Sequence, residues 1–181
     1  AAWEANPNRH DRQLTLKAYG KINLCLDVAG RRPDGYHDIR GIFQSIALAD
    51  QVTLRVDPEG EGIRLRCDHP GVPTGPENLA WQAARLLLDR LDRKAGVEID
   101  LAKRIPIAAG LGGGSADAAA TLVGLTRLLR PPISDGELAR MGKGLGADVP
   151  FCLQGGTAVA EGIGDILEDI PCSPSYAVLV L

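Results

Sequence analysis

The stretch Pro106-Ile-Ala-Ala-Gly-Leu-Gly-Gly-Gly-Ser-Ala-Asp-Ala-Ala-Ala-Thr121 is the most informative part of this chain. It holds four glycines in five residues, followed by Ser115 and an alanine-rich run. Glycine has no Cβ, so the backbone here can turn sharply and bring its N–H groups close to a ligand. The pattern predicts a helix over 116–129 with Ser115 as its N-cap. The first turn of such a helix favours anions, and the stretch therefore predicts a phosphate-binding loop.

Three other interpretations of this loop compete. The P-loop requires a lysine after its last glycine, whereas Gly114 is followed by Ser115. The dinucleotide motif G-x-G-x-x-G fits at Gly110 and Gly112, but its third glycine position is Ser115. A glycine-rich turn that merely precedes an ordinary helix is the third interpretation. The residues elsewhere in the chain decide among them.

Composition excludes several classes of protein. The chain has 181 residues, 45% of them apolar, which suits one domain or one domain and part of a second. Its formal net charge of −3 gives no electrostatic footprint for nucleic acid. No apolar run approaches the ~18 residues of a membrane span. The four cysteines are widely spaced and form no C-x-x-C pair, so they predict reduced thiols in a cytoplasmic protein.

Alternating apolar and polar residues predict strands with one buried face. These segments are 14–18, 22–28, 52–56, 63–67 and 97–101, and the apolar-rich 39–48 and 157–160 are also expected to be strands. The sequence Asp57-Pro-Glu-Gly60 predicts a hairpin between 52–56 and 63–67. Asn78 is expected to cap a helix over 79–93, and Ser134 with Glu137 forms a capping box that opens a helix to about Gly142. Because most strands precede the helices, we expect an α+β fold with a mostly antiparallel sheet backed by helices.

The two ends of the chain differ from its middle. Residues 1–13 are polar at the start, lack an apolar signal segment and are expected to be a disordered leader. The chain stops within Tyr176-Ala-Val-Leu-Val-Leu181, which predicts a strand.

Three further motifs accompany the glycine loop: Gly20-Lys-Ile-Asn-Leu24, Arg31-Arg-Pro-Asp-Gly-Tyr-His37 and Leu145-Gly-Ala-Asp-Val-Pro-Phe151. Together with the loop, in this order, they resemble the GHMP superfamily of small-molecule kinases, which includes galactokinase, homoserine kinase and mevalonate kinase. Within it they look specifically like the family of 4-diphosphocytidyl-2-C-methyl-D-erythritol kinases, which serve the non-mevalonate route to isoprenoids. The resemblance runs from about residue 16 to about residue 170. It implies the ribosomal-protein-S5-domain-2-like fold of the GHMP kinase N-terminal domain.

The resemblance also implies a mechanism, ATP-dependent phosphorylation of a hydroxyl on a cytidine-diphosphate-linked polyol. Lys21 and Asp148 are the implied catalytic residues, with Asp148 orienting the hydroxyl or accepting its proton and Lys21 stabilising negative charge. ATP, with Mg²⁺, is the implied cofactor, and Ser115 is the candidate metal ligand. The predicted ATP-binding residues are Pro106, Ala108, Ala109, Gly110, Leu111, Gly112, Gly113, Gly114, Ser115 and Ala116.

Three more residues are predicted to bind the substrate. Asn23 lies two residues after Lys21, on the same strand face, where its amide would hold the hydroxyl end. Tyr36 offers a stacking surface and His37 a hydrogen-bonding ring, and the resemblance implies that both hold the cytosine. Neither nucleic acid nor a membrane is an expected partner.

The chain departs from the family pattern in three respects. Gly20 replaces the usual alanine before the lysine, and Ala116 replaces a second serine, which leaves Ser115 as the only hydroxyl there. Family members also continue for roughly a hundred residues more. We therefore expect 14–164 to be the N-terminal, ATP-binding domain and 165–181 to begin a C-terminal lobe. Two alternatives remain open: a GHMP kinase for another substrate, such as homoserine or mevalonate, and a non-catalytic nucleotide-binding domain of the same fold.

Overall fold

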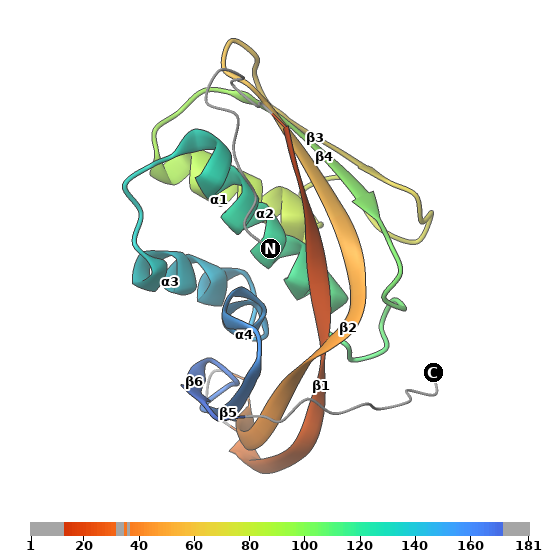
Figure 1. Ribbon diagram of the computed structural model, residues 1–181, viewed down its shortest axis with the longest axis vertical. Helices are drawn as coiled ribbons and strands as arrows, with labels where there is room; N and C mark the ends of the chain where they lie inside the picture. Colours follow the sequence, from red (N-terminus) through yellow and green to blue (C-terminus); the bar gives the residue numbers. More distant parts are fainter. Residues whose placement is uncertain (1–12, 32–34, 36, 172–181) are drawn as a thin grey trace.

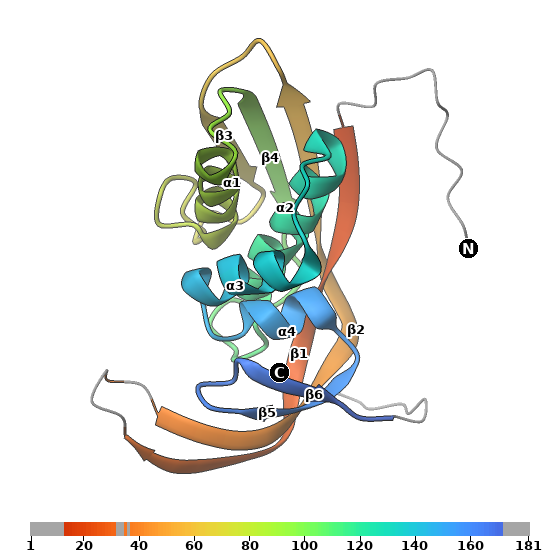
Figure 2. The ribbon, with the colours of Figure 1, turned by 90° about the vertical axis from the view of Figure 1, so that its left-hand side faces the viewer.

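The computed structural model describes residues 13–31, 35 and 37–171. In this part of the chain, a single sheet carries helices on one side only (Figures 1 and 2). The predicted leader, apart from Gln13, and the predicted strand at 176–181 lie outside the described residues.

The two longest strands of the sheet, β1 (Gln13–Arg31) and β2 (His37–Asp57), pair with each other in antiparallel orientation. The sequence predicted two shorter strands within each. The structure joins them into continuous strands whose register shifts near Tyr19, Asn23 and Val28, which are β-bulges or similar irregularities. Such irregularities break the strict alternation of apolar residues while the strand itself continues.

The remaining strands attach to opposite halves of β2. β4 (Gly96–Ala102) pairs with the second half of β2, and β3 (Ile63–Cys67) pairs with β4 in parallel. β5 (Thr157–Glu161) pairs with residues 41–44 of β2, and β6 (Ile166–Asp169) pairs with β5. All pairs except β3–β4 are antiparallel, as predicted for the sheet as a whole.

The predicted hairpin between 52–56 and 63–67 is wrong. The sheet order is β3-β4-β2, so β4 lies between the two segments that were expected to pair. Val97, Ile99 and Leu101 of β4 are all buried, and this strand takes the central place because it contributes the apolar residues that the core needs.

Four helices cover the sheet: α1 (Leu79–Arg90), α2 (Gly113–Leu129), α3 (Asp135–Leu145) and α4 (Val149–Gln154). Two of the three predicted caps are present. Asn78 accepts a hydrogen bond from the N–H of Ala80, and Ser134 accepts one from the N–H of Glu137. The sequence did not predict α4, and α1 ends three residues earlier than expected, at Arg90.

The core lies between α1, α2 and the sheet. Its largest side chains are fully buried: Leu54, Leu87, Ile99, Leu122 and Leu125. A smaller cluster joins Phe43 of β2 to Phe151 of α4, with their rings edge to face and 5.5 Å apart. This second cluster supports the part of the molecule in which the predicted catalytic residues lie.

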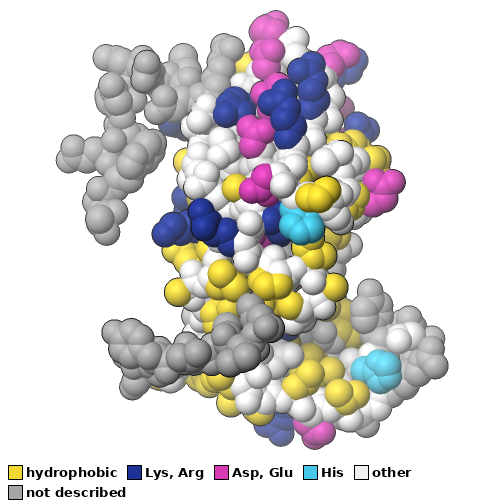
Figure 3. Space-filling view, turned by 90° about the vertical axis from the view of Figure 1, so that its right-hand side faces the viewer, with side chains coloured by type: hydrophobic (Ala, Val, Ile, Leu, Met, Phe, Trp, Pro, Cys, Tyr) yellow, Lys and Arg dark blue, Asp and Glu magenta, His cyan; other side chains and the backbone are white. Residues whose placement is uncertain are grey.

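On the opposite face of the sheet, charged side chains gather where β2, β3 and β4 lie side by side, in the upper part of the view in Figure 3. Arg55 of β2 pairs with Asp100 of β4, and Arg64 of β3 pairs with Glu98 of β4 across the strands. These side chains are partly or largely exposed, which explains why no helix of the described chain packs on this face.

Candidate active site

The glycine-rich stretch connects β4 to α2 and turns through left-handed backbone conformations. Ala108, Gly110 and Gly112 have φ values of 59°, 74° and 70°. Gly112 is itself the N-cap of α2, and no side chain caps the first N–H groups. An α-helix leaves these first groups without partners inside the helix, and its first turn here contains no acidic residue. The arrangement suits an anion such as phosphate.

Ser115 does not cap α2, contrary to the prediction. The left-handed turn at Gly112 starts the helix three residues earlier than a serine cap would, so Ser115 lies within the first turn. A Cβ placed on Gly146 would lie 3.8 Å from the Ser115 hydroxyl oxygen. Ser115 therefore faces the junction between α3 and α4, close to where Asp148 lies.

The glycine loop contacts β1 at Gly20 and Lys21. The N–H of Lys21 donates to the carbonyl of Leu111 at 2.9 Å. A Cβ on Gly20 would lie 3.1 Å from that same carbonyl oxygen, so a residue without a side chain permits this close approach. The contact fixes the loop beside the side chain of Lys21.

Lys21 and Asp148 form an ion pair next to the loop. Nζ of Lys21 lies 3.4 Å from Oδ2 of Asp148, and their side chains are 7% and 31% exposed. Although Asp148 occupies the N-cap position of α4, its side chain caps no N–H and its carboxylate faces Lys21 instead. The buried amine of Lys21 therefore pairs with the carboxylate of Asp148, which is exposed enough for a ligand to reach it.

Two further side chains hold the amine of Lys21. It donates to Oδ1 of Asn23 at 3.0 Å and lies 4.6 Å from the centre of the Phe43 ring. The first contact agrees with the prediction that Asn23 shares a face with Lys21. The second is a cation–π contact, which stabilises a protonated amine in a partly dehydrated site.

A cavity of about 380 Å³ opens beside the glycine loop. Backbone and side chains of the loop form one wall, and Val72, Pro73, Asn78 and Leu79 line the other. Lys103 and Asp117 also reach this cavity. It is continuous with the glycine-rich turn and large enough for part of a nucleoside.

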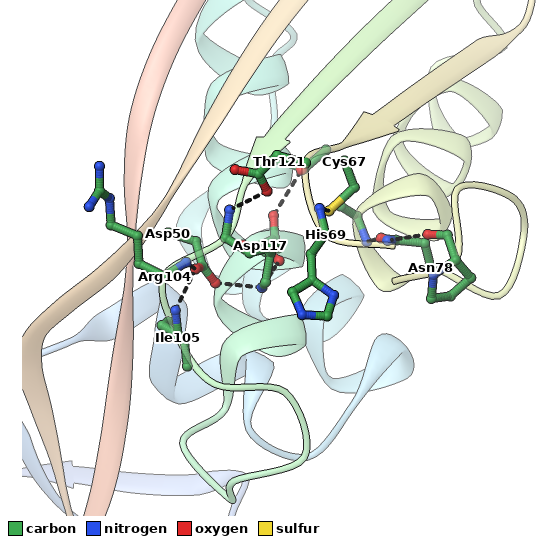
Figure 4. Close-up of polar contacts among 12 residues, drawn as sticks. Asp50, Cys67, His69, Asn78, Arg104, Ile105, Asp117 and Thr121 are labelled. Atoms are coloured by element: carbon green, nitrogen blue, oxygen red, sulfur yellow. Dashed lines mark hydrogen bonds and ion pairs between the residues drawn. The ribbon is translucent and has the colours of Figure 1, made fainter. Parts of the chain in front are cut away.

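Lys103 and Asp117 belong to a buried ionic cluster that the sequence did not predict (Figure 4). Nζ of Lys103 lies 2.5 Å from Oδ2 of Asp50 and 2.6 Å from Oδ2 of Asp117. Burial raises the pKa of Asp117 to about 7, although the charge of Lys103 opposes this shift. Burial alone would lower the pKa of Lys103, but Asp117 and Asp50 outweigh it, so that pKa is raised.

Of the two predicted cytosine-binding residues, the structure describes only His37, because Tyr36 lies outside the described residues. His37 is exposed, and it pairs with Arg31 at the far end of the β1–β2 hairpin, away from the Lys21–Ser45 pair in the same two strands. Its role remains a prediction.

The described residues contain no group of three or more His, Cys, Asp or Glu side chains that could hold a metal ion. Within that part of the chain, no helix is both long and apolar enough to cross a membrane. Cys25, Cys67 and Cys152 are free thiols, and Cys172 lies outside the described residues.

Comparisons with known proteins agree with these features. Residues 78–156 match the model of the GHMP kinases N terminal domain. The chain is 55% identical over 168 residues to a 4-diphosphocytidyl-2-C-methyl-D-erythritol kinase from Moorella thermoacetica, covering 92% of this chain and 58% of that protein. It is 51% identical over 158 residues to a kinase of the same name from Acetivibrio thermocellus, covering 87% of this chain and 55% of that protein. The chain thus spans little more than half the length of these relatives.

Solved structures show the same fold. A crystal structure of 4-(cytidine 5'-diphospho)-2C-methyl-D-erythritol kinase matches with a TM-score of 0.73 and 42% identity, covering 87% of this chain and 55% of that one. A homoserine kinase from Cytophaga hutchinsonii matches with a TM-score of 0.67 over 91% of this chain and 53% of that one, but at 21% identity it shows the fold alone. The chain therefore belongs to the GHMP kinases, in the family of 4-diphosphocytidyl-2-C-methyl-D-erythritol kinases, and has the fold of their N-terminal domain.

Proposed function

We propose that this chain is the ATP-binding part of a kinase that phosphorylates a hydroxyl of 4-diphosphocytidyl-2-C-methyl-D-erythritol. The observation that carries the proposal is the Lys21–Asp148 ion pair beside the glycine loop. A Cβ on Gly112 would lie 3.1 Å from Cγ of Lys21 and 3.8 Å from Oδ2 of Asp148. The loop that suits a phosphate and the pair that suits a hydroxyl are therefore immediate neighbours.

The glycine loop and the cavity beside it divide the binding of ATP between them. The N–H groups at the start of α2 would hold the phosphate chain, and the cavity of about 380 Å³ would take the nucleoside. This arrangement points the terminal phosphate toward Lys21. It supports ATP as the phosphoryl donor, in keeping with the kinase family.

Transfer requires a hydroxyl held in line with the terminal phosphate and compensation of the negative charge that develops. Asp148 accepts a hydrogen bond from the hydroxyl and orients it or takes its proton. Lys21 pairs with Asp148 and stabilises the phosphoryl oxygens. We expect Asn23, which accepts a hydrogen bond from Lys21, to hold the polyol beside them.

Mg²⁺ fits this site in a limited way. Because the described residues offer no cluster of three acidic or imidazole ligands, the ion would be held mainly by phosphate oxygens and water. The Ser115 hydroxyl in the first turn of α2 is the protein group that would join them. When bound, the ion neutralises charge on the phosphates.

The cytidine end of the substrate remains assigned to Tyr36 and His37. The exposed position of His37 leaves its ring accessible to a ligand. We expect His37→Ala to weaken binding of the cytidine substrate and to leave ATP affinity unchanged. An unchanged affinity for cytidine diphosphate would instead favour a GHMP kinase with another substrate.

The free thiols of Cys25, Cys67 and Cys152 support a cytoplasmic location.

The decisive experiment is Asp148→Asn in the full-length protein. We expect turnover with the cytidine-diphosphate polyol to fall by roughly two to four orders of magnitude, with little change in ATP affinity. Asp92→Asn, an exposed change in a turn after α1, is the matched control. Turnover equal to that of the parent would remove Asp148 from the mechanism. Ligand binding without any transfer by the parent would identify a non-catalytic domain.

A further inference from the structure

The buried ionic cluster of Asp50, Lys103 and Asp117 lies at the root of the glycine loop (Figure 4). Lys103 immediately precedes the loop, and Asp117 follows it in the second turn of α2. Asp50 belongs to β2, which does not take part in the loop. The cluster therefore connects three segments: the start of the loop, at Lys103; the helix that follows the loop, at Asp117; and strand β2 of the sheet, at Asp50.

The side chain of Asp50 accepts hydrogen bonds from the residues that begin the loop. Its Oδ1 accepts the backbone N–H of Arg104 at 2.5 Å and that of Ile105 at 2.8 Å. Its Oδ2 pairs with Lys103. The first peptide groups of the loop are thus tied to a side chain that is fully buried in β2.

Lys103 extends the connection to the exit of the loop. Its amine bonds Asp117 as well as Asp50, and a Cβ on Gly113 would lie 3.5 Å from that amine. Gly113 is the first residue of α2. The amine of Lys103 therefore lies close to the first residue of α2, where the proposed function places the phosphates of ATP.

The burial of the cluster is informative. The Lys103, Asp50 and Asp117 side chains are 7%, 0% and 4% exposed. Removing charges from water is expensive, and apolar residues of similar volume often stabilise a core equally well. The general stability of the core therefore does not account for an ionic cluster at this position, whereas a defined geometry between the two ends of the loop does.

We propose that Lys103 is a positioning residue that holds the glycine loop in the conformation that binds the phosphates of ATP. It acts through Asp50 and Asp117, by fixing the spacing between the start of the loop and the N-terminus of α2. The inference rests on the proposed function, because it assigns the loop to ATP phosphates.

The test uses a double variant, Lys103→Met/Asp117→Leu, which removes one positive and one negative charge together. This choice avoids leaving an unpaired carboxylate at Asp117, and Asp50 keeps its two backbone hydrogen bonds. The matched control is Lys143→Met/Asp165→Leu, which removes another ion pair with one buried partner, far from the loop in sequence. Urea unfolding identifies the variants that fold.

Dissociation constants for ATP, inorganic triphosphate and cytidine diphosphate are then measured by calorimetry in the full-length protein. We expect the double variant to bind ATP and triphosphate about 5- to 30-fold more weakly and cytidine diphosphate within about twofold of the parent. The control should bind all three as the parent does. A merely structural role would lower stability without this selective loss.

Three results would overturn the inference. The first is a folded double variant with the ATP affinity of the parent. The second is a loss of ATP affinity without any loss of triphosphate affinity, because Lys103 would then contact the nucleoside and not shape the loop. The third is a parent that binds neither ATP nor triphosphate. A parent that binds ATP but transfers no phosphate would refute the proposed function alone, and the binding constants would still decide the role of Lys103.

If the double variant fails to fold, Lys103→Arg provides the same measurement. It keeps the charge but changes the length and shape of the side chain between Asp50 and Asp117. We expect it to weaken triphosphate binding by at least about threefold and to leave cytidine diphosphate binding unchanged. Unchanged triphosphate binding in a folded Lys103→Arg protein would contradict the proposal.

Discussion

Replacing Gly112 by alanine tests the claim that the glycine loop and the Lys21–Asp148 pair form one site. At a φ of 70°, alanine costs about 1–2 kcal/mol of conformational energy. Its Cβ would also lie 3.1 Å from Cγ of Lys21, where carbon atoms normally keep about 3.5–4.0 Å. Because Asn23 and Asp148 hold the amine of Lys21, the stem of this side chain must move by about half an ångström.

Gly110→Ala is the matched control. Gly110 has a φ of 74°, but a Cβ there would meet nothing within 4 Å. Both variants should therefore lose about the same unfolding free energy, and both methyl groups can raise KM for ATP. Only Gly112→Ala should displace Lys21. Since a displacement of about 1 Å can lower turnover about 100-fold, we expect about a tenfold loss of kcat for this variant alone.

The two variants are compared in the full-length protein by ADP release under saturating substrates and by urea unfolding. The reasoning is refuted if Gly112→Ala retains the kcat of the parent, or if Gly110→Ala loses as much kcat as Gly112→Ala.

Two further predictions concern stability and are checked by urea unfolding. In Gly124→Ala, the new Cβ would lie 2.3 Å from Cδ1 of the fully buried Leu54, so overpacking should outweigh the gain in helix propensity and cost about 1–2 kcal/mol. At Gly144 a Cβ would meet nothing within 4 Å, so Gly144→Ala should instead raise the free energy of unfolding by up to about 1 kcal/mol. A Gly124→Ala protein as stable as the parent would show that α2 does not pack closely on the sheet. Burial alone would raise the pKa of Asp165, but hydrogen bonds from Lys143 and from backbone N–H groups lower it. The ionised carboxylate therefore stabilises the fold above the usual pKa. This contribution disappears as the pH falls through the lowered pKa. Asp165→Asn should therefore cost about 0.5–1 kcal/mol at pH 7 and nothing once the pH is well below the lowered pKa, and a difference that persists in strong acid would contradict this assignment.

The alternation of apolar residues predicted most strands because it reports which face of a strand is buried. It does not report which strand lies alongside. The segment 52–56 therefore appeared to pair with 63–67, its neighbour in sequence, whereas β4 lies between them. The irregularities within β1 and β2 also interrupt the alternation of apolar residues, so the sequence pattern alone did not show that each pair of segments forms one continuous strand.

The site was predicted to a different extent for each of its parts. Lys21 and Asp148 lie in recognisable motifs, and the structure brings them within 3.4 Å of each other. Asp50, Lys103 and Asp117 were missed because charged residues near turns usually face solvent. A weak signal existed in Asp117, an acidic residue within a run of alanines, but only the fold shows that three distant segments share one buried position.

The order β3-β4-β2 has a consequence for synthesis of the protein on the ribosome. When residues 63–67 emerge, the strand beside which they belong has not yet been translated. They must wait for Gly96–Ala102, with the whole of α1 made in between. During this interval the edge of β2 is also unoccupied, and exposed edges of this kind invite pairing with other chains. On its arrival, β4 pairs with β3 and with the second half of β2 at once, and the next residues to emerge are those of the glycine loop. A nascent chain should therefore complete this part of the sheet just before it makes the loop that we propose to hold a phosphate.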